Sequence, residues 1–291
     1  MILIQSLVNA LKGFLIGVAE VIPGVSGGTI ALVVGIYERV LDQAALVAQA
    51  FAVVISSPKT TLRGLSRLDF KFLLPVLSGM VLAIVLGAAV LEPMIAAEPE
   101  ITLGLFAGLI TASLVVPFRM VSRWSLPLIG AGFLGAVFAF GLTSLPRTGS
   151  QDPALWVVFI AAALAVCALV LPGVSGSFFL LAIGLYQPTI AAVNDRDFLY
   201  LGVFALGALI GLFSFSVFMQ HLLLRHRDLT LAVMTGLMLG SLRALWPWQT
   251  DSGGLMAPDE VVAPIGAFFV GLFVVGALIV WQARLKPQSS Q

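Results

Sequence analysis

The stretches PGVSGG at residues 23–28 and PGVSGS at residues 172–177 decide the fold class of this chain. Each copy follows one apolar segment and precedes another, which ends in Gly-x-Tyr at 35–37 and at 184–186. Eight residues of this region have identical partners at an offset of 149. In a membrane protein, helices that are broken in the same way once per half indicate one site built from two halves.

The composition is that of a membrane protein. Hydrophobic residues make up 60% of the chain and charged residues only 10%, with a mean hydropathy of +1.10. Apolar stretches of about 20 residues, each long enough to cross a bilayer as a helix, recur along it. The net charge of +1 gives no indication of nucleic acid, and no such partner is expected. One cysteine and two histidines predict neither a disulfide framework nor a metal site.

The rest of the chain also repeats. At an offset of 128, Asp69-Phe70 matches Asp197-Phe198, and Gly79 matches Gly207. At an offset of 136, Gly130-Ala131 matches Gly266-Ala267. The fall from 149 to 128 means that the first half has about 21 extra residues, which lie within roughly 41–65. This stretch has helical apolar spacing broken by polar residues, so we expect a surface or peripheral helix.

The placement of lysine and arginine predicts how the halves are oriented. Suppose that each motif segment dips into the membrane and returns to the side from which it came. Twelve of the 15 basic residues then face the cytoplasm, and the exceptions are Arg147, Arg196 and Arg243. The acidic loops around Glu98 and Asp259 face outside, and both termini lie inside. This asymmetry follows the positive-inside rule. Three crossings per half give the halves opposite orientations.

The motif itself explains why a helix breaks there. Proline removes a backbone donor and disfavours helix in the preceding residue, while glycine permits unusual backbone conformations. Irregular backbone at membrane depth must be buried in protein or line water. Two helix N-termini, near Thr29 and Phe178, are expected to face each other and form an anion site. The alternative is that Pro and Gly mark only kinks and close helix packing.

These residues carry a resemblance. PGVSGGT after a Glu-containing apolar segment, followed by PGVSGS and an apolar run to Gly-x-Tyr, resembles the polyprenyl-phosphate transporter family over almost the whole chain. The resemblance implies that undecaprenyl phosphate, a C55 lipid carrier of cell-wall synthesis, is flipped from the outer to the inner leaflet of the bacterial cytoplasmic membrane. Its phosphate suits opposed helix N-termini, and its prenyl tail suits lipid-facing apolar walls.

Two alternatives stay open at this point. PGVSGS is similar to the Pro-Gly-x-Ser-Arg-Ser motif of undecaprenyl-pyrophosphate phosphatase, an enzyme with re-entrant inverted repeats. Gly176 and Gly27 stand where that motif has arginine, and Glu20 is one carboxylate where the enzyme has two. Loss of the cation removes a main stabiliser of a phosphoryl-transfer transition state. The third hypothesis is a small-anion transporter with a polar cavity closed to the bilayer.

Single polar residues have competing interpretations. Glu20 lies in apolar surroundings, where a carboxylate is functional by default, so we predict that it couples transport to protons. It could instead pair with a basic neighbour at the membrane interface. Arg243 either contacts phosphate or Glu20, or extends its side chain to the headgroups. Arg39 and Arg119 are positive-inside anchors or guides for the headgroup. The motif serines and Thr29 are helix caps or ligand donors.

The sequence thus predicts an all-α polytopic membrane protein of two inverted-topology repeats, each a re-entrant helical hairpin plus about three transmembrane helices. No cofactor is expected, and the partners are undecaprenyl phosphate, membrane lipids and protons. The first repeat is 1–148, with motif 13–40, peripheral helix 41–65 and spans 72–92, 101–118 and 126–145. The second is 149–286, with motif 155–187 and spans 198–218, 229–245 and 264–283, before a polar tail, 287–291. The predicted substrate-binding residues are Ser26, Gly27, Gly28, Thr29, Ser175, Gly176, Ser177, Arg243, Arg119 and Arg39.

Overall fold

The computed structural model describes residues 2–21, 26–54, 66–144, 153–172, 176, 179–180, 183–250 and 254–285. Within these ranges the chain is helical, and its one β-type pairing is an isolated bridge between Gln249 and Leu255. The helices in chain order are α1 (Ile2–Val21), α2 (Gly27–Val33), α3 (Tyr37–Val54), α5 (Phe70–Ala97), α6 (Pro99–Ser113), α7 (Val115–Met120), α8 (Leu126–Thr143), α9 (Leu155–Val170), α11 (Tyr186–Asn194), α12 (Phe198–Arg225), α13 (Arg227–Ser241), the 3₁₀ helix η1 (Leu242–Leu245) and α14 (Val262–Leu285).

Within the described residues, six helices are long and apolar enough to cross a membrane. Five of them match expected spans: α6 continued by α7, α8, α12, α13 continued by η1, and α14. The sixth is α1, which we expected to be the first arm of a re-entrant hairpin. The expected span 72–92 lies inside α5, a helix of 28 residues. The multi-pass helical class is therefore confirmed, and the re-entrant form of the motif stays a prediction.

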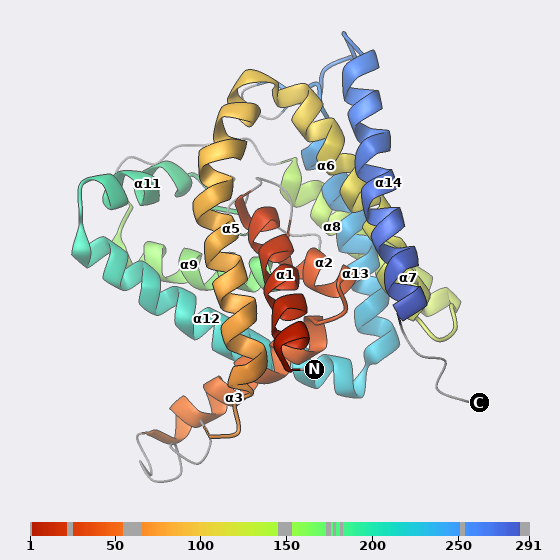
Figure 1. Cartoon of the computed structure of the whole chain (residues 1–291). Helices are drawn as coiled ribbons and strands as arrows, with labels where there is room; N and C mark the ends of the chain where they lie inside the picture. The colour runs from red at the N-terminus through yellow and green to blue at the C-terminus, as the bar shows by residue number, and fades with distance from the viewer. Residues whose placement is uncertain are drawn as a thin grey trace.

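The helices form one bundle with two distinct ends (Figure 1). The connection between α5 and α6 and the start of α14 lie at one end, which is the upper one in the figure. The start of α1, the junction of α12 and α13, and the end of α14 lie toward the other. Helix α3, from the extra stretch of the first half, projects from this lower end. The described connections that carry Glu98 and Asp259 therefore lie at the opposite end of the bundle from the α12–α13 junction, which carries Arg225 and Arg227.

The closest helix pairs come in matching sets. Helix α1 packs along α5 in the first half, and α9 packs along α12 in the second. Two further pairs join the halves, α6 with α14 and α8 with α13. When the two halves are exchanged according to the sequence offsets, α1 with α5 corresponds to α9 with α12. In the same way, α6 with α14 corresponds to α13 with α8. The repeat seen in the sequence therefore extends to the packing.

Glycines make these helix contacts close. A Cβ added to Gly108 on α6 would lie 1.9 Å from the carbonyl oxygen of Phe268 on α14. A Cβ added to Gly236 on α13 would lie 1.8 Å from the carbonyl oxygen of Gly132 on α8. The partners of the two contacts are related by the offsets 128 and 136. Small residues at such positions let backbones touch, which drives helix association in membranes.

The end of each motif segment has the same geometry. Gly35 and Gly184 have φ values of 71° and 76°, a left-handed conformation that glycine adopts without strain. In both copies the next backbone N–H reaches back five residues, from Ile36 to the carbonyl of Ala31 at 2.9 Å and from Leu185 to its counterpart Leu180 at 2.8 Å. This is the hydrogen-bond pattern of a glycine-terminated helix. The repeated Gly-x-Tyr is therefore a helix stop.

Candidate functional site

The first motif contacts the chain just before the second one. Ser26 is fully buried at the N-cap position of α2, but its hydroxyl does not cap that helix. The hydroxyl donates instead to the carbonyl oxygen of Leu171, 3.0 Å away. Leu171 directly precedes Pro172, the first residue of the second motif. The structure thus brings the two motif regions together, although they are 145 residues apart.

Tyr37 makes a second hydrogen bond between these two regions. Its hydroxyl donates to the carbonyl oxygen of Val170, 3.0 Å away, and its side chain is buried. Val170 is the last residue of α9, where backbone carbonyls have no partner within the helix. Ser26 and Tyr37 therefore satisfy carbonyls that the break before Pro172 leaves without helical donors. Tyr37 is not among the residues that the sequence predicts for the site, although its repetition at Tyr186 indicates a role.

Glu20 lies against the start of α2. The backbone N–H of Gly27 donates a hydrogen bond to its carboxyl group. A Cβ at Gly27 would lie 1.9 Å from Glu20 Oε1, so the glycine lets the carboxyl approach the backbone. The side chain of Glu20 is partly buried at the end of α1, beside Ala19, which is buried. The helix start that we predicted as half of an anion site is thus in contact with a carboxyl of the same half.

The other predicted residues of the motifs are only partly described. Gly28 is half-buried and Thr29 is fully buried in α2. Gly176 is buried in the second motif. Ser175 and Ser177 lie outside the described residues, as does the N-terminus expected near Phe178. The predicted pairing of hydroxyls from both motifs around one anion therefore stays a prediction.

Arg243 joins the two halves. It lies in η1, partly buried, and its NH1 donates to the backbone carbonyl of Thr143 at the end of α8. The guanidinium also stands over the ring of Phe140, with 5.7 Å between its Cζ and the ring centroid. These contacts hold the side chain within the protein, against the end of α8. A role in phosphate binding stays a prediction.

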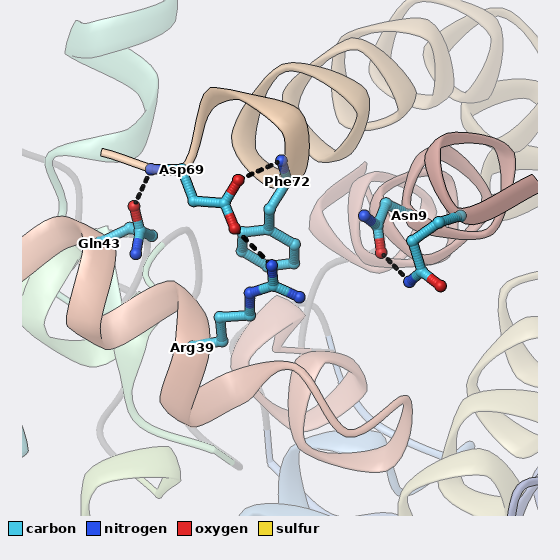
Figure 2. Close-up of polar contacts among 6 residues, drawn as sticks. Asn9, Arg39, Gln43, Asp69 and Phe72 are labelled. Carbon is cyan, nitrogen blue, oxygen red and sulfur yellow. Dashed lines mark hydrogen bonds and ion pairs between the residues drawn. The ribbon is translucent and has the colours of Figure 1, made fainter. Parts of the chain in front are cut away.

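Arg39 takes part in a polar cluster at the start of α5 (Figure 2). Its guanidinium pairs with Asp69 at 2.5 Å and lies 4.1 Å from the centroid of the Phe72 ring. The hydrogen bond from Arg39 lowers the pKa of the Asp69 carboxyl below its ordinary value. Asp69 also accepts the Phe72 N–H at 3.2 Å, and Gln43 Oε1 accepts the Asp69 N–H at 2.8 Å. Arg39 is thus part of the anchor that fixes α3 to α5.

Two further contacts attach α3 to the second half. Glu38 pairs with Arg227 of α13 at 2.8 Å, and Asp42 accepts a hydrogen bond from Gln220 of α12 at 2.7 Å. Arg119 lies apart from these contacts, exposed in the last turn of α7. The structure therefore separates the predicted arginines into three places: the end of α7, the start of α3 and η1. Among the described residues, no group of three or more His, Cys, Asp or Glu could hold a metal ion.

The fold and these contacts define a class of protein. Its described residues form a multi-pass helical membrane protein in which Ser26 of the first motif contacts Leu171, the residue before the second motif. The chain belongs to the undecaprenyl phosphate translocase-like family, whose model matches residues 16–259.

Curated relatives agree with this membership. A polyprenyl-phosphate transporter of Vibrio cholerae is 38% identical over 240 residues, which cover 82% of this chain and 77% of that protein. A polyprenyl-phosphate transporter of Staphylococcus aureus is 28% identical over 304 residues, which cover 94% of each protein. No solved structure matches the chain.

Proposed function

We propose that this protein transports polyprenyl phosphate, and that it returns undecaprenyl phosphate from the outer to the inner leaflet of the bacterial cytoplasmic membrane. The family and the names of both relatives support the cargo class. The observation that carries the proposal is the hydrogen bond from Ser26 to Leu171, because it joins the two motif regions inside a membrane bundle. The phosphate would bind there, between the Ser26–Thr29 segment and the segment around Gly176.

The contact between Glu20 and Gly27 supports a proton-coupled step. An arriving phosphate competes with the Glu20 carboxyl for the backbone N–H of Gly27. An ionised Glu20 carboxyl would repel a phosphate at this distance. Once the carboxyl loses the Gly27 N–H and is left in apolar surroundings, its protonated form is favoured. Glu20 therefore takes up a proton as phosphate binds and loses it when phosphate leaves on the cytoplasmic side. This cycle drives the lipid inward with the proton gradient.

The same contact favours transport over phosphoryl cleavage. The related phosphatase motif has an arginine at the position of Gly27, but a Cβ here already meets the Glu20 carboxyl. The counterpart in the second motif, Gly176, is buried. Without an arginine at either place, the motifs lack the cation that stabilises charge in phosphoryl transfer. A phosphate can still be bound by backbone and hydroxyl donors and passed on intact.

The proposed orientation follows the charges. The end of the bundle with the Glu98 connection and the start of α14 faces outside, and the end with α3 and the α12–α13 junction faces the cytoplasm (Figure 1). Arg225, Arg227 and Arg67 belong to this second end, in agreement with the positive-inside rule. The cytoplasmic loop residues Lys59 and Arg63 lie outside the described residues.

The experiment that tests the function compares outer-leaflet lipid in cells with and without the protein. Undecaprenyl phosphate is expected to accumulate in the outer leaflet when the protein is absent and to fall again when it is restored. Accumulation of undecaprenyl pyrophosphate instead would identify a phosphatase and overturn the proposal. External labelling of a cysteine placed at position 63, with Cys167 replaced, would overturn the orientation.

A further inference from the structure

The first candidate membrane span, Leu3–Glu20 in α1, contains two charged residues, Lys12 and Glu20. They are eight residues apart, which is about 12 Å along a helix axis. Lys12 is the one nearer the start of α1, and that start lies toward the end of the bundle that we place in the cytoplasm (Figure 1). A charged residue inside a membrane span is expected to have a partner or a function.

Lys12 has no partner of opposite charge in the part of the chain that the structure describes. Its side chain is partly buried and makes no ion pair or hydrogen bond there. The described carboxylates of α3 and of the start of α5 are each bound elsewhere: Asp69 to Arg39, Glu38 to Arg227, and Asp42 to Gln220. The positive charge of Lys12 is therefore left without a carboxylate among these residues.

A second cation lies beside Lys12. The glycine contacts between α1 and α5 set their register, and this register brings Asn9 of α1 level with Phe72 of α5 (Figure 2). Arg39 lies over the ring of Phe72, and its side chain is 48% exposed. Lys12 follows Asn9 by three residues, on the next turn of α1, and its charge interacts with that of Arg39. Two accessible cations thus share one carboxylate, Asp69.

Ile16 stands between Lys12 and Glu20 on one face of α1. Residues 12, 16 and 20 are about one helical turn apart, so their side chains share a face. Ile16 is 5% exposed and belongs to one cluster with Ala31 of α2 and Tyr37 of α3. This face of α1 is therefore the one that the first motif covers. Lys12 and Glu20 are two separate positions along it, with the apolar Ile16 between them.

We propose that Lys12 and Arg39 bind the phosphate of polyprenyl phosphate on the cytoplasmic side of Glu20, at the step before release. A phosphate oxygen accepts strong hydrogen bonds from ammonium and guanidinium groups, and its negative charge balances the cation that Asp69 does not. Both side chains are partly exposed, so a headgroup can reach them. This inference rests on the proposed function, which supplies the cargo. It adds the residues that receive the phosphate after it leaves Gly27.

Three variants separate this role from that of a positive charge that only orients the helix. Lys12→Gln removes the charge, and Lys12→Arg keeps it. Lys71→Gln is the matched control, because Lys71 is an exposed lysine in the first turn of α5, close to the same end of the bundle. Thermal unfolding of each purified variant checks that the protein is still folded.

The experiment measures transport by the full chain, inserted in one orientation into phosphatidylcholine vesicles. The probe is polyprenyl phosphate with a fluorescent group at the far end of its tail, supplied to either leaflet. For Lys12→Gln we expect KM to rise roughly tenfold when the probe is loaded from the cytoplasmic side, as for loss of one hydrogen bond to a charged group. Loading from the outer side should keep its KM and lose the same factor in maximal rate, as reversibility requires. Lys12→Arg and Lys71→Gln should behave like the wild type.

Four outcomes would overturn the release site. A KM that is unchanged from the cytoplasmic side, or that rises equally from both sides, in a wild-type background that moves the lipid, would remove the site and leave the transport function intact. Equal losses in Lys12→Arg and Lys12→Gln would exclude a role for the charge. If added phosphatidylglycerol raises the cytoplasmic KM of the wild type but not of Lys12→Gln, the pair holds an ordinary phospholipid headgroup. A wild-type protein that moves no polyprenyl phosphate would remove the site and the function together.

Discussion

The start of α5 and the start of α12 are counterparts in the two halves, and they are built differently. Asp197 caps α12 by accepting the N–H groups of Leu199 and Tyr200 at 3.1 and 3.0 Å. Asp69 caps α5 in the same way but is also paired with Arg39. The helices that precede these two caps also differ, in length: α3 has 18 residues and α11 has nine.

The buried seams of the two halves are alike, in contrast. Gly108 against α14 and Gly236 against α8 have equivalent contacts at nearly equal distances. The motif segments end on the same left-handed glycine. The repeat is therefore retained at these contacts but not at every close one, because Gly104 and Gly240, whose added Cβ would lie 2.4 and 2.1 Å from a backbone carbonyl oxygen, have Ala232 and Ala112 as counterparts.

The largest expected effect tests the shared seams. Gly108→Ala and Gly236→Ala each place a Cβ within 2 Å of a backbone carbonyl oxygen, so the paired helices must move apart. We expect each variant to lose about 3 kcal/mol or more of stability, because a backbone carbonyl cannot move aside to make room for the added Cβ as a flexible side chain can. Thermal unfolding of the purified protein measures this. Gly130→Ala and Gly266→Ala are the controls, because a Cβ at either meets nothing within 4 Å. Tolerance of one seam variant and not the other would break the equivalence of the halves.

The next effect concerns a carboxyl that the halves do not share. The counterpart of Glu20 at the offset of 149 is Leu169, so the second half supplies no such group. We expect Glu20→Gln to abolish the dependence of transport on a pH gradient. Glutamine can accept the Gly27 N–H, but it cannot take up or release a proton. Vesicle transport with and without a gradient measures this. A variant with the wild-type rate and undiminished gradient dependence would rule out the coupling role.

A smaller effect tests the hydrogen bonds that Ser26 and Tyr37 donate to the chain just before the second motif. Ser26→Ala and Tyr37→Phe each remove the donor to a partly buried carbonyl at the C-terminal end of α9, at a cost of about 1–2 kcal/mol. Tyr186→Phe is the comparison, because the hydroxyl of this counterpart has no hydrogen bond among the described residues. We expect it to cost less than Tyr37→Phe in the same unfolding measurement. Equal losses would mean that these hydrogen bonds are not particular to the first half.

The smallest effect sharpens the contrast between Asp69 and Asp197. Asparagine also caps helices, so Asp197→Asn should be nearly neutral, while Asp69→Asn loses the pair with Arg39. That pair is partly exposed and contributes at most about 1 kcal/mol. Because Arg39 lowers the pKa of Asp69, the contribution is complete above the ordinary carboxyl value and is lost as pH falls through the lowered one. The loss of stability relative to the wild type is measured by unfolding at neutral pH in low and in high salt. This loss should depend on salt for Asp69→Asn only, and a salt-independent loss for Asp69→Asn would exclude the ion pair.

The sequence predicted the helical membrane class and most of the spans, because long apolar runs leave few other structures possible in a bilayer. It also predicted the matching contacts of the halves, since the offsets identify the glycines that meet. It did not predict that Ser26 would donate to the carbonyl of Leu171, just after α9, or that Arg243 would contact the end of α8. Both partners are carbonyls left free at helix ends, and backbone groups carry no signature in a list of side chains.

The hydrogen bond between Ser26 and Leu171 also has a consequence for synthesis of the chain. The acceptor is made 145 residues after the donor, and that of Tyr37 is made 133 residues after it. The first motif therefore cannot complete its contacts while the ribosome is still making the first half. α6 and α8 likewise wait for partners from the second half. The first half thus enters the membrane as an unfinished assembly, and the late insertion of α9, α13 and α14 completes both halves together.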